Sequence, residues 1–283
     1  MKVLVTGATG FIGNYVVQEI INKGFHVIAT SINREKAKRY EWFSKVQYID
    51  HDLNEHHDNY FKFFHEPNIL IHLSWEGLPN YKDFFHFERN LFSNYFFLKS
   101  MIEHGLENCV VAGTCLEYGM RSGFLHEDMD TKPVTSYGLA KDTLRRFLEQ
   151  LQYKYKFDLK WLRLFYIYGP GQGSSSILSQ LERSLENQKK VFNMSGGEQL
   201  RDYLPVRKVA EYIVEVAIQD RITGVINCCS GSPVSIRRLV EDYLKHRKQT
   251  IELNVGYYPY SDYEPMAFWG NAVKLKKAVG ETE

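Results

Sequence analysis

A glycine-rich turn close to the N-terminus constrains the fold of this chain more than any other stretch. Residues 1–6 form an apolar run with β-branched side chains, which predicts a short buried strand. The sequence Gly-Ala-Thr-Gly-Phe-Ile-Gly follows at residues 7–13, and residues 14–23 then have the apolar period of a helix. A strand, a glycine turn and a helix in this order are typical of a dinucleotide-binding unit.

The residues of this turn have separate roles in such a unit. Gly7 permits a turn that a residue with a Cβ would resist. Gly10 lets the backbone approach a pyrophosphate, and Gly13 lets the helix pack closely on the strand. Phe11 and Ile12 lie at the start of the helix, whose free N–H groups and positive dipole end would face the phosphates. We therefore predict that these five residues contribute to cofactor binding.

Composition and charge narrow the class of protein. A chain of 283 residues can hold one large α/β domain, or a main domain with a smaller lobe. Apolar residues make up 44% and charged residues 24%, which is ordinary for a globular protein. A formal charge of +1 gives no electrostatic case for binding nucleic acid or an anionic membrane. No apolar run approaches the ~20 residues of a membrane helix, and the chain begins with a core strand, so we expect neither a membrane span nor a signal peptide.

Cysteine and histidine usage predicts a protein with free thiols and no metal. The four cysteines, Cys109, Cys115, Cys228 and Cys229, show neither C-x-x-C spacing nor an obvious pairing pattern. Reduced thiols in a cytoplasmic protein are therefore expected. His56 and His57 lie among acidic residues without a further ligand at metal-binding spacing, which favours a solvated loop.

The spacing of the glycines refines the interpretation. They run G-x-x-G-x-x-G, with one more residue between the first two than in the G-x-G-x-x-G form. This pattern resembles the short-chain dehydrogenase/reductase superfamily. Thr6–Gly13 is similar to its extended branch of nucleotide-sugar enzymes, the NAD-dependent epimerase/dehydratase family. The resemblance covers nearly the whole chain, with its most specific motifs in the first 210 residues.

The resemblance implies a fold and a division of the chain. The fold is α/β, with a Rossmann-type doubly wound parallel sheet and a smaller mixed α/β lobe that binds substrate. We predict that residues 1–166, together with about 204–228, form the NAD(P)-binding domain. Residues 167–203 and 229–283 then form the substrate-binding lobe.

The end of the second predicted strand, residues 25–30, bears on the choice of cofactor. An NAD-binding site usually has an Asp or Glu there for the ribose 2′-hydroxyl. Ser31 and Arg34 follow here without a carboxylate between them, and a hydroxyl with an arginine suits a 2′-phosphate. The sequence therefore favours NADP(H) over NAD(H), with Arg34 as an ordinary surface residue of a helix start as the alternative.

The resemblance implies further cofactor contacts after the third and fourth predicted strands. Asp52 and Leu53 correspond to an Asp-Leu pair that contacts adenine in the family. The residues that stand where the family has Leu-Ala-Ala beside the nicotinamide ribose are Leu73, Ser74 and Trp75. Trp75 departs from that pattern and could narrow the pocket. Asn90 matches an asparagine that the family often has.

The helix predicted over residues 83–105 carries more apolar residues than one buried stripe requires. Many of them are aromatic: Phe84, Phe85, Phe87, Phe92, Tyr95, Phe96 and Phe97. In the extended branch this helix and the helix with the catalytic tyrosine form a dimeric four-helix bundle. The resemblance therefore implies a homodimer.

Three residues match the catalytic residues of the family. Thr114 ends the fifth predicted strand, residues 109–113, at the edge where doubly wound sheets bind ligands. Tyr137 follows 23 residues later. Lys141 lies four residues beyond it, on the same face of a helix predicted over residues 136–156. We predict that Thr114, Tyr137 and Lys141 are catalytic, and that the tyrosine and the lysine also touch the cofactor.

This trio suits acid–base chemistry on a carbonyl group. A free tyrosine has a pKa of about 10, and a neighbouring ammonium such as Lys141 can lower it by roughly 1–3 units. Thr114 can donate a hydrogen bond to the carbonyl oxygen, while Tyr137 gives its proton and the nicotinamide gives hydride. The spacing alone is weak evidence, because Tyr95 and Lys99 share it. Their place before the strand predicts that Tyr95 packs instead.

The resemblance also implies a set of substrate-binding residues. Arg201 lies in an Arg-Asp-Tyr segment similar to one whose arginine holds the nucleotide diphosphate, a role that suits a guanidinium fork. Tyr166 replaces an asparagine that meets substrate phosphate in the family. Glu76 could reach the substrate sugar, with an exposed loop carboxylate as the alternative. Cys115, directly after the catalytic threonine, completes the set.

Neighbouring residues discriminate among the reactions of the family. The 4,6-dehydratases have Asp-Glu directly after the threonine, whereas Cys115 and Leu116 follow here. Epimerase-reductases of the fucose type have a cysteine two residues before the strand-end tyrosine, but Cys115 lies three before Tyr118. Plain 4-epimerases keep NAD bound and normally carry the acidic residue that is missing after Thr30.

The remaining interpretation is a reductase of a nucleotide-linked 4-keto-6-deoxyhexose that uses NAD(P)H. The chain is similar to the dTDP-4-keto-6-deoxyhexose reductases in its short cap and in its Gly-Thr-Cys-Leu-Glu-Tyr-Gly segment. Three alternatives stay open: a 4-epimerase or dehydratase of the same family, a non-catalytic NADP-binding redox sensor, and a reductase of a ketone without a nucleotide.

Overall fold

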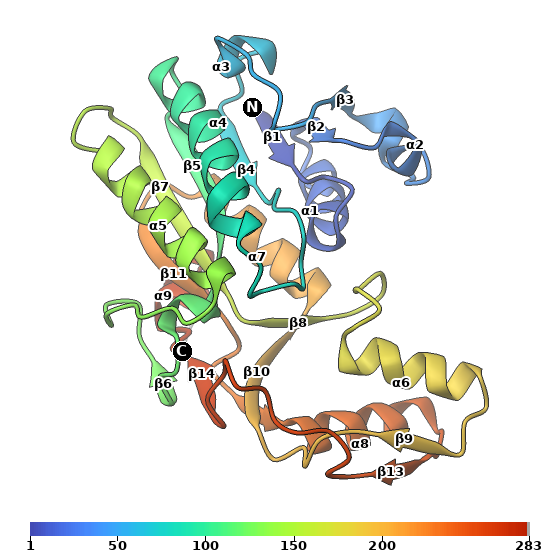
Figure 1. The fold of residues 1–283 in the computed structure, drawn as a ribbon. Helices are drawn as coiled ribbons and strands as arrows, with labels where there is room; N and C mark the ends of the chain where they lie inside the picture. Colours follow the sequence, from blue (N-terminus) through green and yellow to red (C-terminus); the bar gives the residue numbers. More distant parts are fainter. Residues whose placement is uncertain (282–283) are drawn as a thin grey trace.

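The computed structural model describes residues 1–281, and a parallel sheet of seven strands lies at its centre (Figure 1). The strands are β1 (Lys2–Thr6), β2 (His26–Ser31), β3 (Gln47–Asp50), β4 (Ile69–His72), β5 (Asn108–Thr114), β7 (Asp158–Leu164) and β11 (Gly224–Cys228). Their order is β11-β7-β5-β4-β1-β2-β3, and adjacent strands are parallel. The predicted Rossmann-type doubly wound sheet is confirmed.

The strand order reverses between β1 and β4, which are adjacent in the sheet. Both strands are almost wholly buried, and strands covered on both faces form continuous apolar runs. Thr6 at the end of β1 pairs with Thr30 of β2 and with His72 of β4. The carboxyl ends of these strands therefore meet at one edge, where ligands of such sheets bind.

Helices cover both faces of the sheet (Figure 1). On one face, α1 (Phe11–Asn22), α7 (Val206–Ile218) and α9 (Val273–Val279) share a core with Val3 and Val5 of β1. On the other face, α3 (Tyr60–Phe63), α4 (Leu91–Glu103) and α5 (Ser136–Leu151) share a core with Leu4. Successive side chains of a strand point to opposite faces, which is why neighbouring residues of β1 serve different cores.

The aromatic region predicted as one helix over residues 83–105 is irregular in its first part. A π-helical turn, η2 (His86–Asn90), precedes α4. Buried side chains explain the irregular turn. His86 is held by Trp75 and by the backbone of Asn80, and Asn90 Nδ2 donates to the backbone oxygen of Glu76 at 3.0 Å. Such π turns are frequent at functional sites.

Two further predicted boundaries differ in the structure. The strand predicted over residues 160–168 is two strands, because the chain leaves the large sheet at Phe165. After that residue β8 (Tyr166–Tyr168) pairs with β10 (Leu200–Pro205) in a second sheet, together with β12 (Pro233–Ser235). The helix predicted to residue 156 ends at Leu151.

A smaller lobe lies below the large sheet in Figure 1. It contains α6 (Ile177–Glu186), α8 (Ile236–Arg247) and the strand pair β9 (Val191–Asn193) and β13 (Glu252–Asn254). These elements have their own apolar core, which includes Leu181, Phe192 and Val240. Ser235 caps α8 as predicted, since its hydroxyl accepts the Arg238 N–H at 3.1 Å. The division of the chain into two domains at the predicted boundaries stays a prediction.

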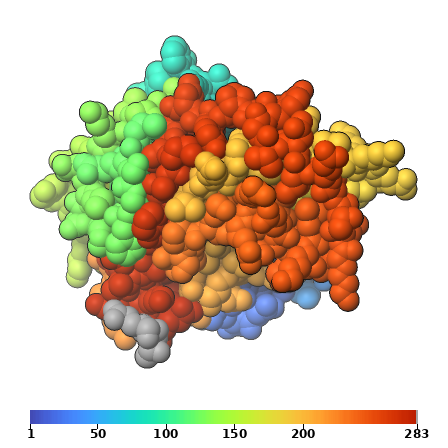
Figure 2. Space-filling view, turned by 90° about the horizontal axis from the view of Figure 1, so that it is seen from below, coloured from blue at the N-terminus to red at the C-terminus, as the bar shows by residue number. Residues whose placement is uncertain are grey.

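The C-terminal part of the chain returns from the lobe to the large sheet. Figure 2 shows its residues, in orange and red, spread across the face seen from the lobe side. In this part β14 (Phe268–Gly270) pairs with β6 (Gly123–Leu125), and Ala267 forms a bridge with Leu200. Within residues 1–281, no helix has both the length and the apolar character needed to cross a bilayer.

Candidate active site

The glycine turn has the geometry that the sequence predicts. Gly7 has a φ of +66°, a conformation that side chains other than glycine rarely adopt. A Cβ on Gly13 would lie 2.2 Å from the backbone oxygen of Gly7, so only glycine lets α1 approach β1 this closely. These features fit the turn to a dinucleotide, because the close approach brings the N-terminus of α1 to the pocket edge.

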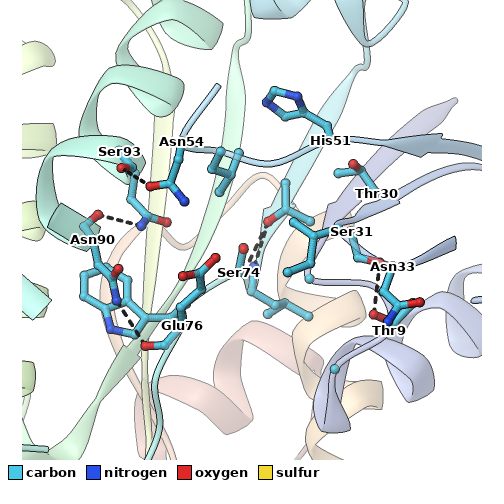
Figure 3. Close-up of a pocket in the computed structure, with 18 of the residues that line it drawn as sticks. Thr9, Thr30, Ser31, Asn33, His51, Asn54, Ser74, Glu76, Asn90 and Ser93 are labelled. Carbon is cyan, nitrogen blue, oxygen red and sulfur yellow. Dashed lines mark hydrogen bonds between the residues drawn. The ribbon is translucent and has the colours of Figure 1, made fainter. Parts of the chain in front are cut away.

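A pocket of about 350 Å³ opens beside this turn, at the carboxyl edge of the sheet (Figure 3). The predicted residues that line it are Gly7, Gly10, Ser31, Leu53, Leu73, Ser74, Trp75, Glu76 and Asn90. Other lining residues were not predicted: Thr6, Thr9, Thr30, Ile32, Asn33, Lys36, His51, Asn54, Ser93 and Asn94. Phe11, Ile12 and Gly13 belong to the first turn of α1 and do not themselves line the pocket.

At the β2 end of the pocket, Arg34 begins the short helix α2 (Arg34–Ala37), which is the alternative that the sequence left open. Its Nε lies 2.5 Å from Asp50 Oδ2, and Arg34 is absent from the pocket lining, which includes Lys36 instead. The sequence argument missed Asp50 because β3 brings this carboxylate beside Ser31 from 19 residues further along the chain. The Ser31 hydroxyl bonds the Tyr48 hydroxyl at 2.7 Å.

Asp52, predicted to contact adenine, does not line the pocket. Its carboxylate accepts hydrogen bonds from the backbone N–H and the side-chain amide of Asn54, at 2.9 and 2.8 Å. This local turn directs Asn54 and Leu53 to the pocket. Asp52 therefore helps to hold this loop, and its contact with adenine stays a prediction.

A buried hydrogen-bond chain ties the ends of β1 and β4 to helix α4. The Thr6 hydroxyl bonds His72 Nδ1 at 2.9 Å and accepts the backbone N–H groups of Leu73 and Ser74. His72 Nε2 bonds Asn94 Oδ1 at 2.6 Å. Burial, with the nearby Lys141, lowers the pKa of His72 to about 3, so the imidazole is neutral. Sequence reasoning missed this chain because its members are far apart along the sequence.

The three predicted catalytic residues come together from two elements. Thr114 ends β5, and Tyr137 and Lys141 lie on α5, whose N-cap Thr135 accepts the Gly138 N–H at 3.0 Å. Both α5 residues are buried, and only 2% of the Lys141 surface is exposed. The Lys141 ammonium donates to the backbone oxygen of Ala112 at 2.8 Å.

The pKa of the tyrosine differs from the prediction. Burial raises the pKa of Tyr137 above its ordinary value, reinforced by the nearby Tyr81 and Glu117, and a hydrogen bond with Thr114 only partly opposes this. Burial lowers the pKa of Lys141 to about 7, although Glu117 opposes it. The predicted lowering of the tyrosine pKa by Lys141 does not hold in this structure, because the loss of solvation outweighs it.

Trp75 lies between the pocket and the catalytic lysine. The Lys141 ammonium sits 4.0 Å from the centre of its indole ring, a cation–π contact. The indole N–H donates to His86 Nδ1 at 3.0 Å, and His86 Nε2 bonds the backbone oxygen of Asn80. The aromatic ring of Tyr137 packs against both Trp75 and His86. Trp75 therefore lies between the pocket that it lines and the predicted catalytic pair.

The predicted substrate residues Tyr166 and Arg201 are joined by a residue that was not predicted. Arg201 Nη2 lies 3.0 Å from Glu264 Oε2, and the Tyr166 hydroxyl donates to the other carboxylate oxygen. All three are largely buried, with the guanidinium 4.6 Å from the ring of Phe268. Glu264 belongs to the segment 257–269, whose aromatic and proline content did not identify individual residues.

The other two predicted substrate residues differ in exposure. Glu76 lines the pocket and pairs with Arg89 at 2.7 Å, with part of its side chain exposed. Cys115 is buried next to Phe165 and Phe268, and burial raises the pKa of its thiol. The cysteines predicted to be free thiols are free in the structure.

Two histidines and a glutamate lie close together in the segment after β3, which the sequence spacing did not predict. His51, Glu55 and His57 bring potential ligand atoms within 4.8 Å of one another. Burial lowers the pKa of His51 to about 4, while Glu55 is largely exposed. Exposed carboxylates near histidines are common without a metal, so we assign no metal to this group.

The glycine turn, the lined pocket and the Tyr–Lys pair at the carboxyl edge define a dinucleotide-binding α/β protein of the dehydrogenase type. Comparison with known proteins identifies the family. Residues 3–229 match the NAD dependent epimerase/dehydratase family. The chain is 32% identical over 272 residues to dTDP-6-deoxy-L-talose 4-dehydrogenase (NAD(+)) of Aggregatibacter actinomycetemcomitans, across 95% of this chain and 99% of that protein. The chain therefore belongs to this family of enzymes, as the sequence predicted.

Other relatives share the whole architecture. An uncharacterized UDP-glucose epimerase of Bacillus subtilis (strain 168), YtcB, is 24% identical over 300 residues, across 98% of this chain and 91% of that protein. The structure of MoeE5 in complex with UDP-glucose and NAD is 26% identical and superposes with a TM-score of 0.84, covering 100% of this chain and 93% of that one. UDP-glucuronic acid 4-epimerase from Bacillus cereus, at 22% identity, has the same fold with a TM-score of 0.85, across 100% of this chain and 94% of that one.

Proposed function

We propose that the chain reduces the 4-keto group of a nucleotide-linked 4-keto-6-deoxyhexose, with dTDP as the nucleotide, using NAD(P)H. The observation that carries this proposal is the convergence of Thr114, Tyr137 and Lys141 at the sheet edge. These residues do not themselves line the pocket, but Trp75 does, and its ring contacts both Tyr137 and Lys141. The 32% identity to a dTDP-6-deoxy-L-talose 4-dehydrogenase over nearly the full length supports the same reaction type.

The proposed chemistry divides between the cofactor and three side chains. The nicotinamide, when bound, supplies hydride to the carbonyl carbon. Thr114 donates a hydrogen bond to the ketone oxygen, and Tyr137 gives that oxygen its proton, so that the product is an alcohol. Lys141 as an ammonium binds the hydroxyls of the nicotinamide ribose and stabilises the tyrosinate that proton transfer leaves. Because Tyr137 is buried with a raised pKa, it holds its proton until the oxygen becomes basic.

The structure favours reduction over elimination of water. A dehydratase needs a further acid and base at the sugar, and the carboxylate nearest to Thr114 along the chain is Glu117. This carboxylate is fully buried, and its oxygens accept bonds from Thr114, Trp161 and Arg163. A group engaged in this way does not exchange protons with a substrate. A 4-epimerase remains the second candidate, because the relative YtcB is named a UDP-glucose epimerase.

Cys115, the neighbour of Thr114, belongs to a buried apolar cluster with Phe165 and Phe268, and Tyr166 packs against it. We infer that the C6 group of the sugar meets this cluster, which accommodates the methyl group of a 6-deoxyhexose more readily than a 6-hydroxyl or 6-carboxylate. The guanidinium of Arg201 lies 4.6 Å from the Phe268 ring and is paired with Glu264, so it offers no free positive charge for a sugar carboxylate.

For the cofactor, we propose NADP(H) in preference to NAD(H). Residues 31–34 at the end of β2 include no carboxylate, and Lys36 lines the pocket, where it could meet a 2′-phosphate. NAD(H) is the second candidate, because the talose dehydrogenase relative is named for NAD(+) and MoeE5 was solved with NAD.

We also propose a cytoplasmic homodimer. Phe84, Phe92, Phe96 and Leu139 present about half or more of their surface to solvent, on the region formed by α4, its preceding turn and α5. A second copy of the chain would cover these side chains. Phe92→Asp should convert a dimer to monomers in sedimentation at micromolar concentration, whereas Tyr153→Asp, at an exposed aromatic residue past the end of α5, should not. A wild-type chain that sediments only as a monomer would contradict this assignment.

The reaction is tested with purified protein, NADPH or NADH, and dTDP-4-keto-6-deoxyhexoses. We expect oxidation of the cofactor with wild type, and a loss of roughly 10²–10⁴-fold in kcat with Tyr137→Phe, because the phenol supplies the acid. Tyr95→Phe is the matched control, since Tyr95 begins the other Tyr-x-x-x-Lys pair and packs against Phe147 at a 5.2 Å centroid distance. Wild-type protein inert toward every such ketone would refute the reductase, and an equally low rate in wild type and Tyr137→Phe would favour the redox sensor.

A further inference from the structure

A single buried carboxylate joins the elements that carry the proposed catalytic trio. Glu117 lies in the 3₁₀ turn η3 (Cys115–Tyr118), directly after β5, and its side chain is fully buried. Its Oε1 accepts the Thr114 N–H at 2.8 Å and the Trp161 indole N–H at 2.9 Å, and its Oε2 accepts Arg163 Nε at 2.8 Å. A buried carboxylate with three such donors is held in one position.

The same turn fixes the hydroxyl group of the threonine. The backbone N–H of Leu116 donates to Thr114 Oγ1 at 3.2 Å. Thr114 and Glu117 also form a reciprocal capping box, in which the threonine side chain accepts the Glu117 N–H and the glutamate side chain accepts the Thr114 N–H. Both the backbone and the hydroxyl of Thr114 therefore depend on the geometry of this turn. The hydroxyl keeps its own proton free to donate elsewhere.

Glu117 also faces the helix that carries the tyrosine and the lysine. Arg145 of α5 has its Nε 4.0 Å from Glu117 Oε2, and that Nε has no hydrogen-bond partner although it is buried. The guanidinium of Arg145 is held at its other nitrogens by Asp142 and Glu149 of the same helix. An ionic contact thus connects the strand-end turn to α5, one turn beyond Lys141.

The backbone of Gly113 lies directly against the Glu117 carboxylate. A Cβ on Gly113 would lie 2.7 Å from Glu117 Oε1 and 2.1 Å from Trp161 Nε1. The residue before the threonine must therefore be glycine for the carboxylate to occupy this site.

We propose that Glu117 is a positioning residue that holds Thr114 in place and sets its negative charge against α5, the helix that carries Lys141. This inference rests on the proposed function, in which both residues act on the bound cofactor and ketone. Glu117 itself would touch neither the cofactor nor the ketone, because its side chain is fully buried in the core.

The surroundings of Lys141 explain why this one charge matters. From β4 and the loop after it come the neutral His72 and the indole of Trp75, and from η2 comes the buried His86. Tyr137 is the titratable group one turn earlier on the same helix. Glu117 is the carboxylate whose charge raises the pKa of Lys141 against the effect of burial. Without that charge the ammonium would lose its proton at a lower pH.

The test compares the pH dependence of NADH affinity in three proteins, measured by the fluorescence of bound NADH. In wild type we expect affinity to fall as the pH rises through about 7, because Lys141 loses the proton with which it binds the ribose. In Glu117→Gln/Arg163→Met the midpoint should fall by about one pH unit. The second substitution avoids an unpaired guanidinium opposite the new amide, and methionine can pack on the Tyr118 ring that Arg163 now covers. In Arg163→Met alone, where the carboxylate loses its counter-charge, the midpoint should rise.

Kinetics with the ketone separate positioning from a general loss of stability. The double variant should lose roughly tenfold or more in kcat with little change in KM, because Thr114 is displaced while the nucleotide contacts remain. Glu117→Asp, which keeps the charge on a shorter side chain, should restore the wild-type NADH midpoint. Asp202→Asn removes another fully buried carboxylate that accepts bonds from Ser230 and Gly231, and it should destabilise the fold without moving the midpoint.

An unchanged midpoint in the double variant, or a wild-type affinity that does not vary with pH, would overturn the proposal. So would a midpoint in Asp202→Asn that moves as far as in the double variant. If wild type reduces no nucleotide-sugar ketone, the proposed function fails, whereas the NADH midpoints still decide the role of Glu117. Should the double variant not fold, Glu117→Asp and Arg163→Met alone carry the comparison.

Discussion

The cofactor side and the substrate side of this molecule are built in opposite ways. On the cofactor side, residues 7–13 are neighbours in the sequence and run from the end of β1 into the first turn of α1. On the substrate side, Tyr166, Arg201 and Glu264 meet in space although 98 residues separate the first from the last. The cofactor side depends on a local backbone turn. The substrate side depends on a buried charge cluster whose members come from β8, β10 and the segment before β14.

This difference determines which substitutions each side tolerates. A turn that brings two backbones together is sensitive to added volume, because its constraint is steric. A buried charge cluster is sensitive to the removal of one partner, because the remaining charge has lost both water and its counter-ion. The following experiments test whether the two sides fail for these separate reasons.

The largest effect is expected on the substrate side, from Glu264→Ala. This change leaves Arg201, with only 4% of its side chain exposed, without its carboxylate. Removing one partner of a buried pair typically costs about 3–5 kcal/mol of unfolding free energy, measurable by urea denaturation. Lys82→Ala is the control, because its pair with Asp262 is exposed and should contribute at most about 1 kcal/mol. A similar small loss in both variants would show that the cluster is not a buried ion pair in solution.

On the cofactor side, Gly13→Ala should act through binding. The new Cβ would meet the backbone oxygen of Gly7 at 2.2 Å, so the turn must move away from the phosphates. We expect at least about a hundredfold loss of NADH or NADPH affinity in fluorescence titration, since a displaced turn removes several backbone contacts at once. Gly173→Ala is the matched control, because a Cβ there meets no atom within 4 Å. Equal cofactor affinity in Gly13→Ala and wild type would contradict the steric account of the turn.

The same contrast explains how much the sequence could predict. Strand, turn and helix at residues 1–23 are encoded by local pattern, and the sheet, the family and the positions of Tyr137 and Lys141 followed from such patterns. The sequence did not single out Glu117 and Glu264, because their buried interactions are with partners that only the folded chain brings to them. The sequence also missed the point at Phe165 where the chain passes from the large sheet to the second sheet, and the π turn at residues 86–90. The hydrophobic periodicity continues through both segments, so it does not reveal either change.

Arg34 shows the limit of local reasoning most directly. From residues 31–34 alone, Arg34 could be a ligand of a 2′-phosphate or an ordinary surface residue of a helix start. The neighbouring strand supplies Asp50, and the resulting pair removes Arg34 from the pocket lining. A local pattern predicts which residues are nearby along the chain, but it does not predict which opposite charges arrive from another strand.

A pH experiment tests the junction between β1 and β4 that underlies the cofactor side. The pKa of His72 is lowered to about 3 in the folded chain, against an ordinary value near 6.5. The unfolded chain therefore binds more protons between these values, so stability contributed by the neutral ring is lost as the pH falls. From pH 7 to pH 5 we expect a loss of about 2 kcal/mol from this residue. His72→Asn should flatten the acid side of the stability profile, whereas His104→Asn, at an exposed position, should leave it unchanged. Parallel profiles for wild type and His72→Asn would show that His72 is not the buried, neutral link described above.

The smallest expected effect concerns the choice of cofactor. It compares Arg34, which the sequence suggested as the phosphate ligand, with Lys36, which lines the pocket in the structure. If Lys36 meets the 2′-phosphate, Lys36→Ala should weaken NADPH binding about tenfold, the effect of losing one charge-assisted hydrogen bond, while NADH binding stays unchanged. Arg34→Ala should change the NADPH to NADH ratio far less, because Asp50 already holds the guanidinium. The opposite ranking would mean that the Arg34–Asp50 pair opens when NADPH binds, and that the sequence identified the phosphate ligand correctly. Equal effects of both variants on NADH and NADPH would remove the argument for NADP(H), since neither cation would then distinguish a phosphate from a hydroxyl.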